Sequence, residues 1–151
     1  MMRLMILFAG LIFVGCGNPR GTNTGNPARP VFSAFPEAET LMSDVCKTVA
    51  GCFATASIED CMKQVPDLPD YTKFLGKVAA GYSTMSSLGE AENAHRVQVN
   101  NSHAETCSKT MRSLSCSDPI VLKSYSAVAP DSYATTNELF QASTDCAEIY
   151  F

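Results

Sequence analysis

Cysteine content constrains the fold of this chain more than any other feature of its sequence. Seven of the 151 residues are cysteine, and the first of them, Cys16, directly follows an apolar N-terminal run. The other six all lie after residue 36: Cys46, Cys52, Cys61, Cys107, Cys116 and Cys146. An even set of cysteines predicts three disulfides in a chain that is exported from the reducing cytosol, and it leaves their connectivity open. The seventh cysteine therefore needs a separate explanation.

The first 16 residues have the organisation of an export signal. Arg3 supplies a positive start, residues 4–14 form an apolar run, and the small residue Gly15 precedes Cys16. The run is shorter than the about 20 apolar residues that a membrane-spanning helix needs. Its length and its flanking residues are those of a secretory signal. We therefore expect the protein to be exported.

Residues 13–16, Phe-Val-Gly-Cys, resemble the lipobox of bacterial lipoproteins, although leucine is more common than phenylalanine at the first position. The resemblance implies that residues 1–15 are a signal peptide that is removed, and that Cys16 carries acyl chains that anchor the protein in the membrane. Gly17 stands where aspartate would retain an enteric lipoprotein in the inner membrane, so the resemblance implies the outer membrane. The alternative is an ordinary signal peptide that is cut nearby, with Cys16 present by chance.

Residues 16–35 have the composition of a flexible tether. Glycine, asparagine, proline and threonine dominate, and no helical or strand period is present. Such a segment buries too little apolar surface to offset the entropy of ordering it. A tether of this length would hold the following domain roughly 25 Å from the membrane.

Residues 36–151 are long enough to form a single domain with one hydrophobic core, which three disulfides would reinforce. They contain 15 acidic side chains and 8 lysines or arginines, a net charge of −7. Nucleic-acid binding requires clustered basic side chains. The charge therefore excludes nucleic acid as the expected partner.

Helical spacing of apolar residues runs through most of this domain. The sequence predicts helices over residues 36–51, 58–65, 71–88, 90–114 (with a possible break near Asn100-Asn101), 119–125 and 139–150. No run of residues alternates as a half-buried strand does. The expected fold is thus all-α, a small disulfide-braced bundle of about five helices behind a flexible N-terminal tether.

Helix geometry restricts which cysteines can pair. Cys107 and Cys116 would lie ~13 Å apart along an unbroken helix, whereas a disulfide requires Cα atoms within about 7 Å. Cys46 and Cys52 fail the same test if both are helical. Neither of these two pairs is therefore expected.

The turn between the first two predicted helices lies between Cys52 and Cys61, so these two cysteines are expected to pair. Cys46 and Cys146 are then each expected to pair with one of the two cysteines between residues 100 and 120.

The cysteine spacing also resembles a known group of proteins. Its elements are Cys46-x5-Cys52, the segment Ser-Ile-Glu-Asp-Cys at 57–61, Cys107-x8-Cys116 and the tether segment 21–27. Together they are similar to the small cysteine-rich helical lipoproteins of delta-proteobacteria. The resemblance covers the signal, the tether and the cysteine framework, and it implies a location in the cell envelope. It implies no particular activity.

Metal ligation is not indicated by the histidines. His95 and His103 would lie about 12 Å apart on one helix, which is too far for a shared ion. The sequence has no Cys-x2-Cys pair, and exported cysteines are expected to be oxidised. We expect two surface histidines, no metal site and no other cofactor.

A catalytic centre is not indicated either. The Gly-x-Ser-x-Gly motif of serine hydrolases is absent. Glu90 with Glu92, and Asp67 with Asp70, are paired carboxylates by spacing alone, and a solvated surface or a helix cap accounts for such pairs. We therefore expect a protein that is not an enzyme.

Most of the domain's notable aromatic residues have core-facing spacing and are expected to lie in the core; these residues are Tyr71, Phe74, Tyr82, Tyr125, Tyr133, Phe140, Tyr150 and Phe151. The terminal segment 149–151 has a second interpretation, as an exposed anchor for a partner.

These features favour a membrane-anchored, non-catalytic envelope lipoprotein. Its expected partners are the membrane, through acyl chains on Cys16, and another envelope protein. The alternative is a small-ligand-binding or enzyme-inhibitor domain displayed in the periplasm or at the cell surface.

Overall fold

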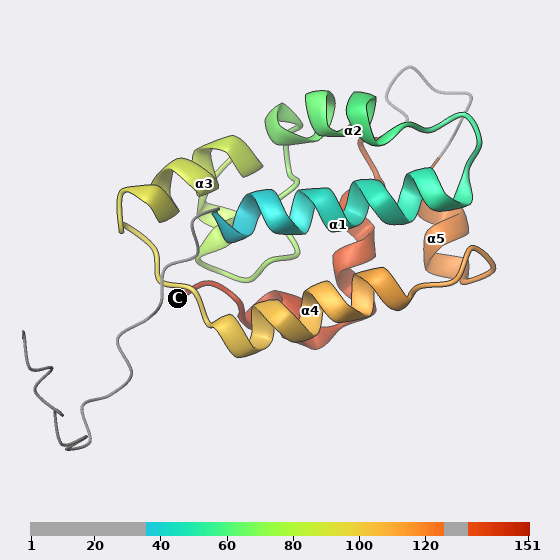
Figure 1. The fold of residues 1–151 in the computed structure, drawn as a ribbon. Helices are drawn as coiled ribbons and strands as arrows, with labels where there is room; N and C mark the ends of the chain where they lie inside the picture. Colours follow the sequence, from blue (N-terminus) through green and yellow to red (C-terminus); the bar gives the residue numbers. More distant parts are fainter. Residues whose placement is uncertain (1–35, 126–132) are drawn as a thin grey trace, which may run out of the picture. The chain divides into compact units, whose positions relative to one another are not determined.

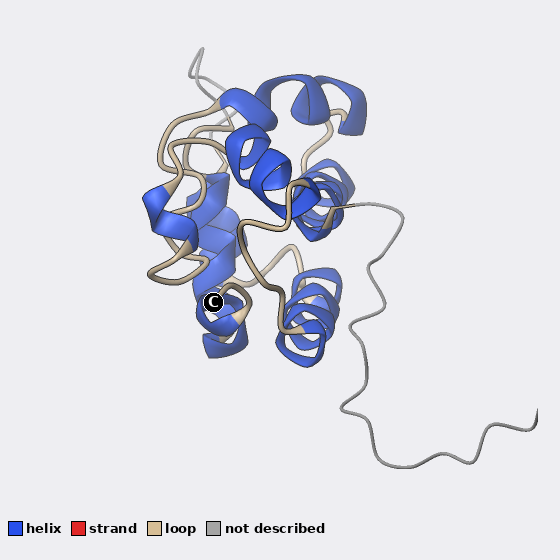
Figure 2. Ribbon diagram, turned by 90° about the vertical axis from the view of Figure 1, so that its left-hand side faces the viewer, coloured by secondary structure: helices blue, strands red, loops and turns tan. Residues whose placement is uncertain are grey.

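The computed structural model describes residues 36–125 and 133–151. The signal peptide (1–15), Cys16 and the tether (16–35) lie outside the described residues and stay predictions. The described part consists of five α-helices and four short 3-10 segments, with no strand in it (Figure 2). The all-α, disulfide-braced bundle predicted from the sequence is therefore confirmed.

Helix α1 is the central element of the domain. It packs against α2 and α3 above it in the view of Figure 1 and against α4 below it. The bounds of these helices are Glu37–Cys52 for α1, Ile58–Gln64 for α2, Met85–Asn93 for α3 and Asn101–Ser113 for α4. No helix in the described residues is long and apolar enough to cross a membrane.

Local signals set several helix ends as expected. Ser57 caps α2 because its hydroxyl accepts the Asp60 N–H at 3.0 Å. The 3-10 segment η1 (Val65–Asp67), which contains a proline, follows α2 directly. Helix α5 (Pro119–Ser124) begins with proline at its first position, where the missing N–H costs nothing.

The predicted helix over residues 71–88 is wrong. Turns and the 3-10 segment η2 (Ala79–Gly81) occupy its first part, and α3 begins only at Met85. Asp70 and Gly76 have positive φ angles of 61° and 99°, which a right-handed helix excludes. Thr84 and Ser87 then form a reciprocal capping box, which starts α3 anew. The predicted end of this helix at residue 88 is also wrong, because α3 continues to Asn93.

The long predicted helix over residues 90–114 is two helices with an extended link, and Asn100 caps the second of them. This link pairs with the C-terminal residues: the Gln98 N–H donates to the Phe151 carbonyl at 2.9 Å, and the Phe151 N–H donates back at 3.1 Å. The predicted final helix over residues 139–150 is instead two 3-10 segments, η3 (Thr136–Ala142) and η4 (Thr144–Glu148).

Helices α1 and α4 lie side by side and run in the same direction (Figure 1). Two buried polar contacts set their register. The Ser108 hydroxyl donates to the Asp44 carboxylate, and the Thr48 hydroxyl donates to the Met111 carbonyl at 3.0 Å. Buried polar groups are costly without partners, so a displacement of one helix along the other would be penalised.

Three disulfides connect the six cysteines of the domain. They are Cys46–Cys61, Cys52–Cys116 and Cys107–Cys146, with Cα–Cα distances of 5.6, 5.0 and 5.0 Å. The first links α1 to α2, the second links the end of α1 to the loop after α4, and the third links α4 to η4. The excluded pairs, Cys46–Cys52 and Cys107–Cys116, do not form, and Cys146 pairs with a cysteine of α4 as expected.

The expected Cys52–Cys61 disulfide is wrong, and so is the expected partner of Cys46. Cys61 lies one turn inside α2, on the buried face that packs against α1, so it meets Cys46 in the middle of α1 rather than Cys52 at its end. Helix α4 ends at Ser113, which frees Cys116 to reach Cys52.

Candidate functional site

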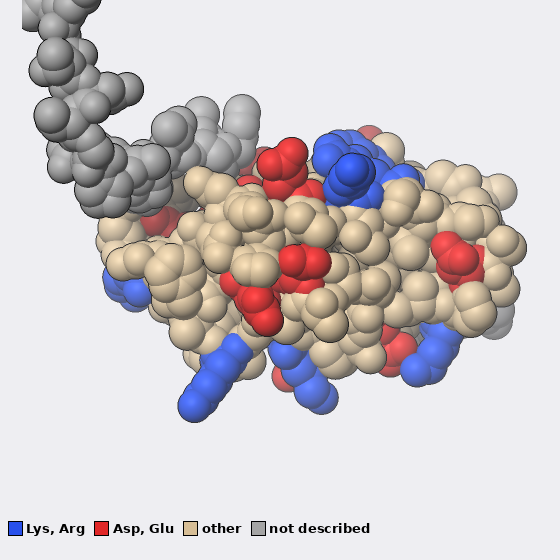
Figure 3. Space-filling view, turned by 90° about the horizontal axis from the view of Figure 1, so that it is seen from below, with Lys and Arg blue, Asp and Glu red and all other residues tan. Residues whose placement is uncertain are grey.

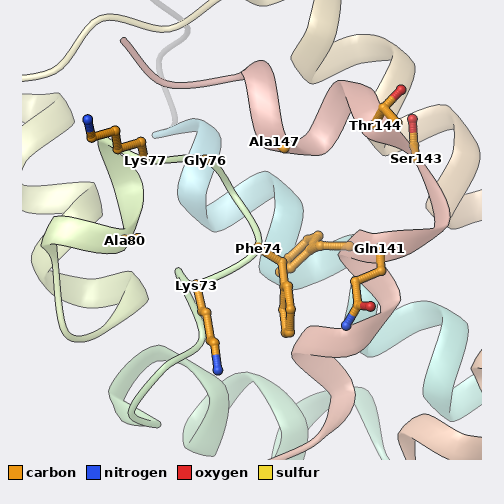
Figure 4. A pocket seen from close by; sticks show the side chains of 10 residues that line it. Lys73, Phe74, Gly76, Lys77, Ala80, Gln141, Ser143, Thr144 and Ala147 are labelled. Atoms are coloured by element: carbon orange, nitrogen blue, oxygen red, sulfur yellow. The ribbon is translucent and has the colours of Figure 1, made fainter.

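A surface groove lies between residues 73–80, which the sequence predicted as part of a helix, and the segments η3 and η4. Its volume is about 430 Å³. Its lining is Lys73, Phe74, Gly76, Lys77, Ala80, Phe140, Gln141, Ser143, Thr144 and Ala147. Figure 4 shows Phe74 and Gln141 facing each other across it, with Lys73 and Lys77 on the opposite wall from η4.

Gly76 brings the two walls of the groove together. A Cβ atom at this position would lie 2.3 Å from the carbonyl oxygen of Ala147, far inside van der Waals contact. The φ angle of 99° also strongly favours glycine. Because Cys146, next to Ala147, is bonded to Cys107, the η4 wall is held on its other side as well.

The floor of the groove is aromatic. Phe140 is buried, and Phe74 is half-buried at the groove surface. The buried Tyr71 packs edge-on against Phe140, with ring centroids 6.1 Å apart, and its hydroxyl is hydrogen-bonded to Thr136. Burial raises the pKa of Tyr71 well above its usual range, so Tyr71 is a neutral support beneath the floor.

The two lysines give the groove a positive rim. Both side chains are exposed, and neither forms an ion pair with an acidic group in the described part of the chain. The Lys73 amine lies 5.9 Å from the centroid of the Phe74 ring, within the range of a cation–π contact. Lys63 and Lys123, by contrast, are paired with Glu59 and Glu138.

The groove presents apolar, cationic and neutral polar side chains. Its lining contains no carboxylate, histidine or cysteine, and its ionisable side chains are the exposed Lys73 and Lys77. Thr144 and Gln141 offer polar groups at the wall, whereas the Ser143 hydroxyl is already hydrogen-bonded to Asp145. An apolar floor between cationic groups suits an occupant that is apolar and anionic.

His103 is the centre of a second polar cluster, which the sequence did not reveal. Its Nδ1 lies 2.7 Å from an Asp145 carboxylate oxygen, and its Nε2 lies 3.3 Å from Glu148. The hydrogen bond with His103 lowers the pKa of Asp145. These partners lie more than 40 residues further along the chain, so no local motif indicated them.

This arrangement differs from a catalytic triad. Both ring nitrogens of His103 face carboxylates, and the Ser143 hydroxyl donates to Asp145 rather than to the imidazole. His103 therefore has no nitrogen directed at a nucleophile. In the described residues, no group of three or more His, Cys, Asp or Glu side chains is placed to hold a metal ion. His95 lies in the turn after α3, with a positive φ of 55°.

Glu90 and Glu92, which are close in the sequence, do not act as a pair of carboxylates in the structure. Glu92 reaches the start of α1, where its two oxygens accept the N–H groups of Glu37 and Ala38 at 2.8 and 3.0 Å. It thereby caps α1, whose N-cap residue, a proline, makes no side-chain cap bond. Burial raises the pKa of Glu92, although the two hydrogen bonds act against this shift. Glu90 is exposed.

Asp67 and Asp70 also act separately. The Asp67 carboxylate accepts a hydrogen bond from Ser86 at 2.9 Å, and the Asp70 carbonyl accepts one from the Asn137 amide at 3.1 Å. The first contact is with α3 and the second is with η3.

The C-terminal segment is anchored mainly in the domain. Ile149 and Tyr150 are buried, whereas Phe151 is 59% exposed. The Tyr150 hydroxyl is buried with no hydrogen-bond partner among the described residues. Burial, together with the nearby Glu92 and Glu37 carboxylates, raises its pKa well above the usual value. Only Phe151 remains available for the exposed-anchor interpretation.

Charged side chains of both signs are scattered over the face seen in Figure 3, between large uncharged areas. This face shows no extended patch of basic side chains of the kind that nucleic acids require.

No family model, curated protein or solved structure matches this chain.

Proposed function

We propose that this protein is a membrane-anchored, non-catalytic lipoprotein of the cell envelope that acts as an interaction or structural module. In this proposal residues 1–15 are a removable signal peptide, and acyl chains on Cys16 anchor the protein, with the outer membrane as its expected location. The tether of residues 16–35 then displays the helical domain to an envelope partner.

The position of Cys16 is the observation that carries this proposal. It directly follows an apolar run with a cationic start, and it is the odd cysteine of seven. The other six form three disulfides with one another, so none of them requires Cys16 as a partner. This pairing supports a separate use for Cys16, and disulfides of this kind persist in oxidising compartments outside the cytosol.

An interaction role is supported by the character of the domain surface. The groove at Phe74 has binding groups and no acid–base pair, and the His103 cluster is saturated by its own carboxylates. The net charge of −7 in residues 36–151 favours a protein or envelope component over nucleic acid as partner.

Membrane anchoring can be tested with a Cys16→Ser variant expressed in a bacterial host. We expect the parent chain in the membrane fraction with an acyl-chain mass on Cys16, and the variant without that mass and unprocessed by lipoprotein signal peptidase. After washing at high salt and high pH, the parent chain should stay in the membrane fraction, whereas variant chains whose signal has been cut by an ordinary signal peptidase should be released. A Thr22→Ser variant in the tether is the matched control and should keep the acyl mass. Absence of an acyl mass on the parent chain would refute the anchor.

The interaction role can be tested by crosslinking in intact cells and purification of the parent chain. We expect a defined envelope protein to be recovered with the parent chain and to be lost when the domain is unfolded by reduction. Recovery of monomer alone under several growth conditions would contradict an interaction role.

A further inference from the structure

The groove at Phe74 has a distribution of charge that selects among possible occupants. Its floor is apolar, and Lys73 and Lys77 extend toward opposite sides of the short segment that bears Phe74 (Figure 4). Neither lysine forms an ion pair with an acidic group in the described residues, although this domain carries almost twice as many acidic as basic side chains. Two separated, unneutralised cations around an apolar floor are complementary to two anions around an apolar group.

We propose that this groove binds an extended acidic segment of a partner protein, with an apolar side chain on Phe74 and carboxylates at Lys73 and Lys77. The inference rests on the interaction role proposed above and specifies the chemistry of the partner. In an extended peptide every second side chain points to the same face. A peptide that places two carboxylates on the same face as a central apolar side chain has the pattern acidic, any, apolar, any, acidic, which spans about 13 Å between its outer residues.

The walls of the groove also suit a peptide. Gln141 and Thr144 lie along the η3–η4 wall with polar groups that can bond to a peptide backbone. The groove opens to solvent, whereas small-molecule sites enclose most of their ligand. Gly76 and the Cys107–Cys146 disulfide hold the two walls in place, so little ordering of the protein is required on binding.

Binding can be measured with a fluorescein-labelled peptide of sequence Gly-Glu-Ser-Leu-Ser-Glu-Gly and the full chain embedded in phosphatidylcholine nanodiscs. Fluorescence anisotropy should give a dissociation constant of about 0.1–1 mM, which is typical of a short flexible ligand on an open site. Replacing both glutamates of the peptide by glutamine, or its leucine by glycine, should weaken binding by about tenfold or more. Equal binding of all three peptides would overturn the proposal.

Protein variants localise the effect. Lys73→Gln and Lys77→Gln should each weaken binding about two- to fivefold, as expected for partly exposed ion pairs, and the double variant should weaken it further. Lys63→Gln, which removes the same charge from a lysine on α2 that is already paired with Glu59, is the matched control. If Lys63→Gln weakened binding as much as Lys73→Gln does, the attraction would be general rather than located in the groove.

A small amphiphilic anion is the competing occupant, and octanoate is its probe. We expect octanoate to displace the peptide only at concentrations well above the peptide's dissociation constant. Displacement at lower concentrations would identify a small-ligand site and overturn the peptide proposal. These measurements are independent of the crosslinking experiment: failure of peptide binding would leave an envelope partner intact, and failure to recover a partner would leave the peptide affinity unchanged.

Discussion

Gly76→Ala should strongly destabilise the domain. The new Cβ would lie 2.3 Å from the Ala147 carbonyl oxygen and 3.1 Å from its carbonyl carbon, so backbone atoms rather than a flexible side chain would have to move. Residue 147 cannot withdraw freely, because Cys146 is bonded to Cys107 of α4. The positive φ of 99° adds a conformational penalty for any residue with a Cβ.

The expected loss for Gly76→Ala is about 2–4 kcal/mol, of which about 1–2 kcal/mol comes from the left-handed backbone and the rest from the contact with Ala147. A domain of this size has a typical stability of about 5–15 kcal/mol, so the variant should still fold but melt roughly 10 °C lower.

The measurement is urea and thermal unfolding followed by circular dichroism, with all three disulfides intact. Gly81→Ala is the matched control, because an added Cβ there meets no atom within 4 Å and no positive φ opposes it. This control should be neutral, or stabilised by several tenths of a kcal/mol through a less flexible unfolded chain. If Gly76→Ala stayed within 0.5 kcal/mol of the parent, the close approach of this turn to η4 would be refuted.

Two further perturbations address the disulfides and the cap of α1. Under mild reduction of the folded protein, the Cys52–Cys116 disulfide should open first, because Cys116 is exposed and Cys52 only half-buried, whereas the other four cysteines are fully buried. Alkylation and peptide mass spectrometry would show this order. Earlier opening of the Cys46–Cys61 disulfide would contradict it. Glu92→Gln should change the pH dependence of stability: because the pKa of Glu92 is raised in the folded state, the folded chain binds more protons than the unfolded chain between the two pKa values. The parent should therefore gain stability relative to Glu92→Gln as the pH falls from 7 toward about 4.5, and urea unfolding that showed a constant or shrinking difference would contradict the raised pKa.

Elements with local signals could be predicted from the sequence. The apolar stripe and acidic first turn of α1, the Ser57 cap of α2 and the proline that begins α5 all involve contacts within a few residues. Asn100 likewise marks the start of α4. The number of disulfides could also be predicted, because it follows from the even count of six cysteines after residue 36.

The turn at residues 70–84 could not be predicted, because the signal for a helix there was present and was overridden. Tyr71, Leu75 and Met85 do face the core, as the stripe predicted. Between Leu75 and Met85 the backbone takes a left-handed conformation at Gly76, where it lies close to Ala147 of η4, about 70 residues further along the chain. An isolated glycine in a helical pattern was the available signal, although most such glycines are tolerated within helices.

The disulfide pairing and the groove depend on the same kind of long-range information. Which residue of α1 meets Cys61 depends on how α2 packs back against α1, and which residue meets Cys52 depends on where α4 ends. The groove combines a floor from Phe74 with a second wall from η3 and η4. Helical periodicity does not predict such contacts, because it describes only one element at a time.

The site and the disulfides are physically connected through α4. Helix α4 is held against α1 by the buried Ser108–Asp44 contact, and the Cys107–Cys146 disulfide fixes η4 to that same helix. The η4 wall of the groove is thus fixed to the centre of the domain, while Gly76 brings the lysine-bearing wall against it. A groove whose walls are fixed by covalent and buried contacts retains its shape without a ligand, which lowers the entropic cost of binding a flexible peptide. In a domain of this size the disulfides therefore have two roles: they stabilise the fold, and they preorganise the surface that we propose meets the partner.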